Sequence, residues 1–94
     1  MPRQNISSGT PWEETTGYSR AVRVGSMVFV SGTTASDAAG RLVGGDDPYA
    51  QAVYILRKIE AALAQAGARL EDVVRTRIYL ADIGQWQAVA RAHH

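Results

Sequence analysis

One long amphipathic helix, bordered on both sides by strand-like segments, restricts this chain more than any other feature of its sequence. Asp47 and Pro48 are typical of a helix start, because an aspartate side chain accepts hydrogen bonds from free amides and proline has no N–H to satisfy. Gly67 is typical of the residue just beyond a helix end. Between them, apolar residues recur at steps of three and four, namely Ala52, Leu56, Ile59, Leu63 and Ala66. The other side carries Gln51, Arg57, Lys58 and Gln65. The pattern predicts a helix from about Pro48 to Ala66 with one face packed on a sheet.

A β-hairpin is predicted ahead of this helix. Residues 18–24 alternate polar and apolar side chains, and a second β-rich run follows at residues 27–31. Only Gly25 and Ser26 separate the two runs, and a glycine in the first loop position can adopt the positive φ of a type II′ turn. Residues 32–45 contain four glycines and little periodicity, so we expect a loop with at most a short edge strand near residues 33–35.

A third strand and a second helix are predicted after the long helix. Residues 73–80 alternate between two faces of a strand. One face carries Val74, Ile78 and Leu80, and the other carries Arg75, Arg77 and Tyr79. With the strand and helix before it, this segment predicts a crossover unit whose helix covers one face of the sheet. A second amphipathic helix follows residues 82–84, with inward side chains expected at Trp86, Val89 and Ala90.

The length of the chain allows one domain, residues 1–94. Residues 1–17 mix Ser, Gly, Thr and Pro without a period, which predicts an extended lead-in held at most by Trp12. The second helix reaches His94 after about two turns. An α/β arrangement that has begun its second helix normally returns to the sheet, so we expect that C-terminal strands of this architecture are missing from the chain.

Composition excludes several classes of protein. With 46% hydrophobic and 20% charged residues the chain is neither disordered nor membrane-embedded, and no apolar run approaches the roughly 20 residues of a membrane span. The net charge of +1 provides no field that favours nucleic acid. The absence of cysteine excludes disulfides, a thiolate zinc site and a catalytic thiol. The N-terminus lacks a secretion signal, so we expect a cytoplasmic protein.

Familiar catalytic motifs are missing. Residues 44–47 precede a helix, but their two aspartates lie where a phosphate would approach the amides. His93 and His94 are adjacent, so on a helix they diverge and predict no metal site. The acidic pairs 13–14 and 71–72 are interpreted as solvated turns. Ser31 has no histidine beside it in the sequence, which favours a binding role, through a backbone amide left free where the hairpin ends at Ser31 and Gly32, over covalent attack.

Arg75 and Arg77 leave two interpretations open. Two guanidinium groups on one strand face require water, carboxylates or another chain opposite them. They either face solvent, or the sheet face without helices meets its counterpart in an oligomer. Tyr79 and Tyr18 suit such an interface because they are large, rigid and polar at one end, although half-buried strand tyrosines explain them equally well.

Four segments, in a fixed order around the long helix, together form a pattern specific enough to indicate a protein family. They are YSRAVRVG at residues 18–25, VFVSG at 28–32, LEDVVRTR at 70–77 and IYLADI at 78–83. In this order the chain, from about Gly17 to its end, resembles the RidA family, also called YjgF/YER057c/UK114 or L-PSP. The lead-in SSGTPWE at residues 7–13 resembles subgroups away from the best-studied deaminases.

This resemblance implies a fold and an activity. The implied fold is a chorismate-mutase-like α+β fold, a sheet with helices packed on one face, assembled as a homotrimer with ligand clefts between subunits. Members of the family hydrolyse 2-aminoacrylate-type enamines and imines to 2-oxo acids and ammonia without a metal or cofactor. An arginine pairs with the substrate carboxylate, and a positioned water attacks the imine carbon.

The family's site residues transfer in part. Tyr18 matches the cleft tyrosine, and Ser31 with Gly32 matches the Ser-Gly pair of the cleft wall, so these three are the expected substrate-binding residues. Ala90 stands where the family has a cleft asparagine. The carboxylate-binding arginine and the acidic residue near the water belong to C-terminal strands beyond residue 94, and neither Arg75 nor Arg77 replaces them by position.

Three functions follow from the resemblance. The first is an enamine/imine deaminase acting on a small carboxylate-bearing metabolite, with an incomplete active site in 94 residues and no catalytic residue assigned. The alternative is a non-catalytic, small-ligand-binding trimer. The third is an L-PSP-type endoribonuclease or translation inhibitor, which near-neutral charge and the absence of a stacked aromatic platform disfavour.

Overall fold

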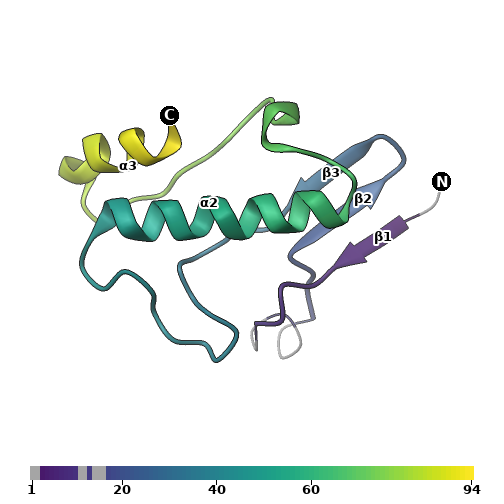
Figure 1. Ribbon diagram of the computed structural model, residues 1–94, viewed down its shortest axis with the longest axis horizontal. Helices are drawn as coiled ribbons and strands as arrows, with labels where there is room; N and C mark the ends of the chain where they lie inside the picture. The colour runs from purple at the N-terminus through teal and green to yellow at the C-terminus, as the bar shows by residue number, and fades with distance from the viewer. Residues whose placement is uncertain (1–2, 11–12, 14–16) are drawn as a thin grey trace.

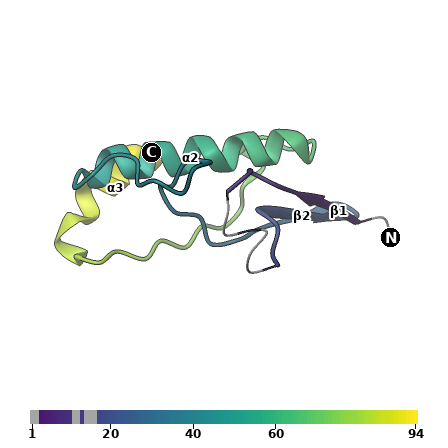
Figure 2. The ribbon, with the colours of Figure 1, turned by 90° about the horizontal axis from the view of Figure 1, so that it is seen from below.

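A helical layer covers one face of a small antiparallel sheet. The computed structural model describes residues 3–10, 13 and 17–94. The sheet has three strands in the order β1-β2-β3, formed by Arg3–Ile6, Ala21–Val24 and Met27–Val30. Helix α2, Pro48–Gln65, lies along one side of this sheet, and helix α3, Trp86–His93, packs beside α2 (Figures 1 and 2). This arrangement confirms the predicted α+β sheet with helices on one face.

The predicted hairpin is confirmed. Strands β2 and β3 pair antiparallel from Ala21 opposite Val30 to Val24 opposite Met27. Gly25 has a φ of 59°, whereas no non-glycine residue in the described part of the chain has a positive φ. A positive φ at the first loop position only is the type II′ pattern that the sequence predicts.

Strand β1 was not predicted, because residues 1–17 carry no alternating pattern. Its four residues pair with β2, with Arg3 opposite Val24 and Ile6 opposite Ala21. The folded part therefore begins before Tyr18. Ile6 is 2% exposed and belongs to the hydrophobic core, so a single apolar side chain fixes which face of this strand points inward. Trp12, the expected anchor of the lead-in, lies outside the described residues.

Helix α2 follows its prediction closely. The Asp47 side chain accepts hydrogen bonds from the N–H groups of Tyr49 and Ala50, and Gly67, which follows the C-cap residue Ala66, has a φ of 81°. Small residues form the contact with the sheet, which lets the helix approach the strands closely. The core comprises Ile6, Ala21, Ala62 and Ala66, with the partly buried Val28 packed against it.

Residues 32–45 form the expected loop. Its only strand-like pairing is an isolated bridge between Ser36 and Leu42, so no edge strand forms at residues 33–35. Ala35 and Ser36 are buried beneath the helix. Lys58, predicted on the outer side of α2, instead donates to the backbone oxygen of Ser36 at 2.9 Å, because the loop folds back along that side of the helix.

Residues 73–80 are not a paired strand, and this prediction is wrong. The segment is extended and runs at the level of the sheet in Figure 2, but within the described ranges it forms no ladder with β1, β2 or β3. Val74 is 99% and Tyr79 84% exposed, and Arg75 and Arg77 also face solvent. Alternation marks the two faces of an extended segment, whereas a strand also needs a partner backbone in reach. The crossover unit is therefore incomplete.

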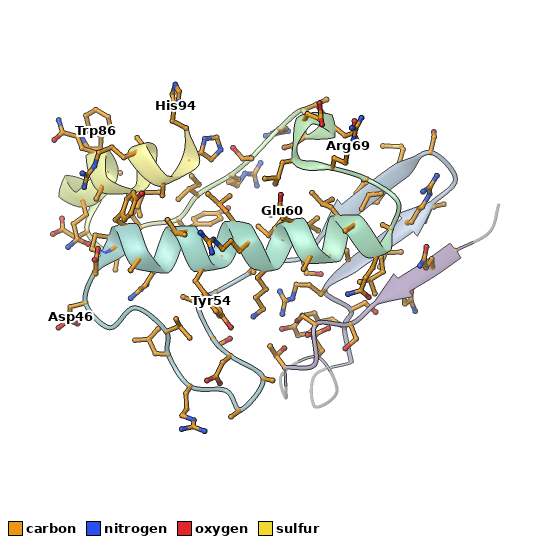
Figure 3. All side chains as sticks on the ribbon, viewed as in Figure 1. Asp46, Tyr54, Glu60, Arg69, Trp86 and His94 are labelled. Carbon is orange, nitrogen blue, oxygen red and sulfur yellow. The ribbon has the colours of Figure 1, made fainter. Side chains whose placement is uncertain are left out.

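The second helix begins after a short 3-10 turn, η2, at Ile83–Gln85. Val89 is buried as predicted, but Trp86 is 55% exposed and Ala90 is exposed, so these two inward positions are wrong. Figure 3 shows Trp86 and His94 pointing away from α2. The Arg91 guanidinium lies 5.2 Å from the centre of the Tyr49 ring, which ties α3 to α2 on the other side. Within the described ranges, no helix combines the length and apolarity that crossing a bilayer requires.

Candidate functional site

A buried carboxylate lies at the centre of the N-terminal end of the fold. Glu13 is 5% exposed, which contradicts its interpretation as part of a solvated turn. Its oxygens accept hydrogen bonds from the Ser8 and Thr10 hydroxyls and from the backbone N–H groups of Ser8, Thr10 and Arg20. Ser8, Thr10 and Arg20 thus surround this carboxylate, and each hydrogen bond replaces one that water would have made.

The environment of Glu13 keeps it ionised. Burial by itself raises the pKa of a carboxyl group, but the side-chain and backbone hydrogen bonds from Ser8 and Thr10 together outweigh it and lower the pKa from 4.5 to about 2. A carboxylate with so low a pKa is a weak base and has no proton to donate in neutral solution, and its oxygens are already occupied, so it is poorly suited to general acid–base catalysis. Glu13 therefore has an electrostatic and structural task.

Arg20 is the cation that Glu13 faces. It is 2% exposed, and its Nη2 lies 3.8 Å from a Glu13 carboxylate oxygen. Its guanidinium donates through Nε to the Ser8 hydroxyl at 3.2 Å and through Nη1 to the Gly32 carbonyl at 2.6 Å and the Thr33 hydroxyl at 3.2 Å. The planar guanidinium thus joins the lead-in to the loop that follows β3.

Tyr18 lies against the same guanidinium. Arg20 Nη2 donates to the Tyr18 phenol oxygen at 3.0 Å, and the guanidinium carbon lies 5.3 Å from the ring centre. Tyr18 is half-buried, so its ring is held by Arg20 while part of it remains accessible. A phenol oxygen that accepts from a guanidinium keeps its own O–H free to donate to a ligand.

Ser31 and Gly32 lie on the other side of Arg20. The Ser31 amide donates to the Arg20 carbonyl at 3.0 Å and its hydroxyl to the Ser19 carbonyl at 2.6 Å, so neither group is free. Gly32 is exposed, and its N–H has no acceptor within the described part of the chain. The free amide at the end of the hairpin therefore belongs to Gly32.

The structure thus brings Tyr18 and Gly32 together through a residue that the sequence analysis missed. Arg20 and Glu13 carried a weak signal. Arg20 is a charged residue directly before a strand, and Glu13 belongs to an acidic pair, residues 13–14, in a stretch of the lead-in that has no other charge. Periodicity could not pair them, because the burial of Glu13 depends on hydrogen bonds from Ser8, Thr10 and Arg20 that no periodic pattern encodes. Ala90, His93 and His94 belong to the surface of α3.

The arrangement offers hydrogen-bond donors rather than a nucleophile or a metal site. The described ranges contain no group of three or more His, Asp or Glu residues able to hold a metal ion. Two surface hollows, one at Arg3 and Arg23 and one between residues 78–83 and α3, do not include Tyr18, Ser31 or Gly32. On this chain Tyr18 and Gly32, with Ser31 beside Gly32, lie at an open surface outside these hollows, and this surface is named the wall.

A lysine lies near this wall. Burial lowers the pKa of the Lys58 amine, the nearby positive charge of Arg20 lowers it further, and the charge of Glu13 opposes both effects. Its ammonium group donates to backbone oxygens of the 33–37 loop. Lys58 therefore holds this loop in place beside the Arg20 network.

The fold and this wall define a class: a two-layer α+β protein whose hairpin end carries polar groups gathered around a buried ion pair. The sequence profile described as Endoribonuclease L-PSP matches residues 10–94. The chain accordingly belongs to the RidA/YjgF/L-PSP family.

Individual relatives agree with this membership. A crystal structure of a YjgF/YER057c/UK114 family member from Mycobacterium tuberculosis has 52% sequence identity and a TM-score of 0.85, over 98% of this chain and 71% of that chain. RidA from the Antarctic bacterium Psychrobacter sp. PAMC 21119 has 32% identity and a TM-score of 0.80, over 95% of this chain and 72% of that chain.

Curated relatives are longer than this chain. The protein SCO2049 of Streptomyces coelicolor is 42% identical over 96% of this chain and 66% of its own length. A RutC family protein of Pyrococcus abyssi is 39% identical over 73% of this chain and 54% of its own length. The chain thus spans about two thirds or less of these relatives.

Proposed function

We propose that this protein binds small 2-oxo and 2-imino acids at the wall formed by Tyr18 and Gly32, and takes part in hydrolysis of enamines and imines. The observation that supports this most is a pair of donors with no acceptor among the described residues, the Tyr18 O–H and the Gly32 N–H. One guanidinium contacts both residues, through the Tyr18 phenol oxygen and the Gly32 carbonyl. Such donors suit a carboxylate or carbonyl oxygen. The likeness to a solved RidA supports membership of the family, and the resemblance to that family implies the same class of ligand.

The proposed reaction adds water across a C=N bond. The imine carbon accepts the water oxygen, the nitrogen takes up protons, and collapse of the resulting carbinolamine releases ammonia and leaves the 2-oxo acid. The contribution of Tyr18 and Gly32 is orientation of the substrate, and Glu13 is poorly suited to proton transfer because it is buried, weakly basic and fully hydrogen-bonded. The alternative is a ligand-binding trimer without turnover, and Ala90, which stands where the family has a cleft asparagine, favours it.

We further propose that the protein acts as a homotrimer with its cleft between subunits. Val28 packs toward the core under α2, so its neighbours Met27 and Phe29 point to the opposite, uncovered face of the sheet. These two side chains are 58% and 56% exposed. A second subunit against this face would bury them and close the wall into a pocket.

Three measurements test the proposed function. 2-Aminoacrylate is generated enzymatically in the presence of the protein, and pyruvate release is followed; the Tyr18→Phe variant is the matched control because it removes only the hydroxyl. The deaminase is supported if pyruvate is released faster with the wild type than in buffer alone and faster than with the Tyr18→Phe variant. Calorimetric titration with 2-oxobutyrate separates the alternatives, since binding without acceleration favours the ligand-binding protein. Cleavage of an RNA substrate without binding of the oxo acid would favour the endoribonuclease.

A further inference from the structure

Arg20 is the largest fully buried side chain of the described residues, and its hydrogen bonds converge on the proposed ligand wall. At 2% exposure it cannot itself reach a ligand. Burial of a guanidinium is costly unless an opposite charge and hydrogen bonds compensate, and here Glu13 and four acceptors provide both. The contacts of the buried guanidinium indicate a role for it, because they reach Tyr18 and Gly32.

One hydrogen bond of Arg20 fixes the position of the Tyr18 hydroxyl directly. Arg20 Nη2 donates to the phenol oxygen at 3.0 Å while the same guanidinium lies over the ring. The N–H groups of the planar guanidinium point in fixed directions. The position of the Tyr18 phenol oxygen, bonded to Nη2, is therefore fixed relative to the two acceptors bonded to Nη1, the Gly32 carbonyl and the Thr33 hydroxyl.

Another contact fixes the orientation of the Gly32 N–H through the hydroxyl of Thr33. Arg20 Nη1 donates to the Thr33 hydroxyl, which in turn donates to the Ser31 carbonyl at 2.8 Å. The Ser31 carbonyl and the Gly32 N–H belong to the same planar peptide group, so holding one orients the other. Arg20 Nη1 also holds the next peptide group through the Gly32 carbonyl.

We propose that Arg20 is a positioning residue for the ligand wall, which sets the Tyr18 O–H and the Gly32 N–H in the relative orientation that a 2-oxo or 2-imino acid requires. The inference rests on the proposed function for the identity of the ligand. Glu13 keeps the guanidinium in place, and Thr33 transmits its position to the Gly32 amide.

The test compares two matched pairs of variants. Arg20→Lys keeps the positive charge but loses the planar guanidinium, and Arg23→Lys makes the same change in a residue that bonds the Gly25 and Ala66 carbonyls instead. Thr33→Val removes the intermediate hydroxyl, and Thr34→Val removes a hydroxyl whose only partner in the described ranges is Ser36. Thr33→Val leaves the buried ion pair intact, so it remains informative if Arg20→Lys does not fold.

Two readouts are recorded on each folded variant. The first is the dissociation constant for 2-oxobutyrate by calorimetry, and the second is the ring-carbon resonance of Tyr18 in protein labelled with ¹³C-tyrosine, assigned with Tyr18→Phe. We expect Arg20→Lys and Thr33→Val to weaken binding about tenfold or more, with Arg20→Lys alone shifting the Tyr18 resonance. Arg23→Lys and Thr34→Val should stay within twofold of wild type and leave the resonance unchanged.

The outcomes separate the inference from the proposed function. If the wild type does not bind 2-oxobutyrate or another 2-oxo acid, the proposed function fails, and the inference fails with it. If the wild type binds and both Arg20→Lys and Thr33→Val bind equally well, the proposed function stands and the positioning role is overturned. A loss of affinity that Arg23→Lys and Thr34→Val share would also overturn it, because general destabilisation would then explain the effect.

Discussion

Neutralising the buried Glu13 should destabilise the protein by an amount that depends on pH in a defined direction. Glu13→Gln keeps the shape of the side chain and removes its charge, leaving Arg20 buried without a counter-charge. The pKa difference between 4.5 and about 2 corresponds to about 3 kcal/mol at neutral pH, from about 1.4 kcal/mol per pKa unit. A domain of this size is stable by only about 5–14 kcal/mol, so the loss is large.

The sign of the pH dependence follows from the lowered pKa. Because the folded pKa lies below the unfolded one, the contribution of Glu13 is fully present above pH 4.5 and is lost as the pH falls through about 2. The difference in unfolding free energy between wild type and Glu13→Gln should therefore shrink from about 3 kcal/mol at pH 7 to about 1.5 kcal/mol at pH 3.

Urea unfolding followed by far-ultraviolet circular dichroism at several pH values measures this difference. Glu60→Gln is the matched control, since Glu60 is exposed on α2 and should change stability by less than about 0.5 kcal/mol at either pH. Equal stability of wild type and Glu13→Gln at pH 7, or a difference that stays constant from pH 7 to pH 3, would refute the reasoning.

Three further substitutions test other parts of the structure. Asp47→Ala removes the side chain that caps α2 and should cost about 1 kcal/mol in unfolding free energy, measured by urea denaturation; no loss would show that the cap contributes nothing. Gly67→Ala places a side chain at a φ of 81° and close to the Arg23 guanidinium, so we expect a loss of about 1–2 kcal/mol, visible as a lower Tm. Phe29→Lys puts a charge on the uncovered sheet face and should convert a trimer into monomers by light scattering without changing the circular dichroism spectrum; an unchanged mass would contradict the proposed interface.

Local signals account for the elements that the sequence predicted. The Gly25-Ser26 turn, the Asp47 cap and Gly67 each depend on the conformational preferences of one or two residues, so they can be identified without knowing what lies nearby. The apolar steps of α2 likewise identify its buried face, although Lys58 shows that a loop can cover a polar position as well.

The remaining features depend on long-range partners that periodicity does not encode. Strand β1 is defined by its pairing with β2 and by one buried side chain, Ile6, which is too little for a pattern. Residues 73–80 have the pattern of a strand but no partner strand among the described residues. The same distinction holds for the site. The resemblance to a family identified Tyr18, Ser31 and Gly32 from the sequence. The buried ion pair of Glu13 and Arg20, which contacts them, could be identified only from the three-dimensional structure.

The unpaired stretch at residues 73–80 makes the link to α3 vulnerable to proteolysis. A protease binds its substrate as an extended chain, and this segment already presents accessible backbone in that form, with Arg75 and Arg77 facing solvent. Trypsin should cleave there before it cleaves within α2, separating the C-terminal helix from the sheet. A ligand or a second subunit that protects this stretch would reveal itself by slower cleavage.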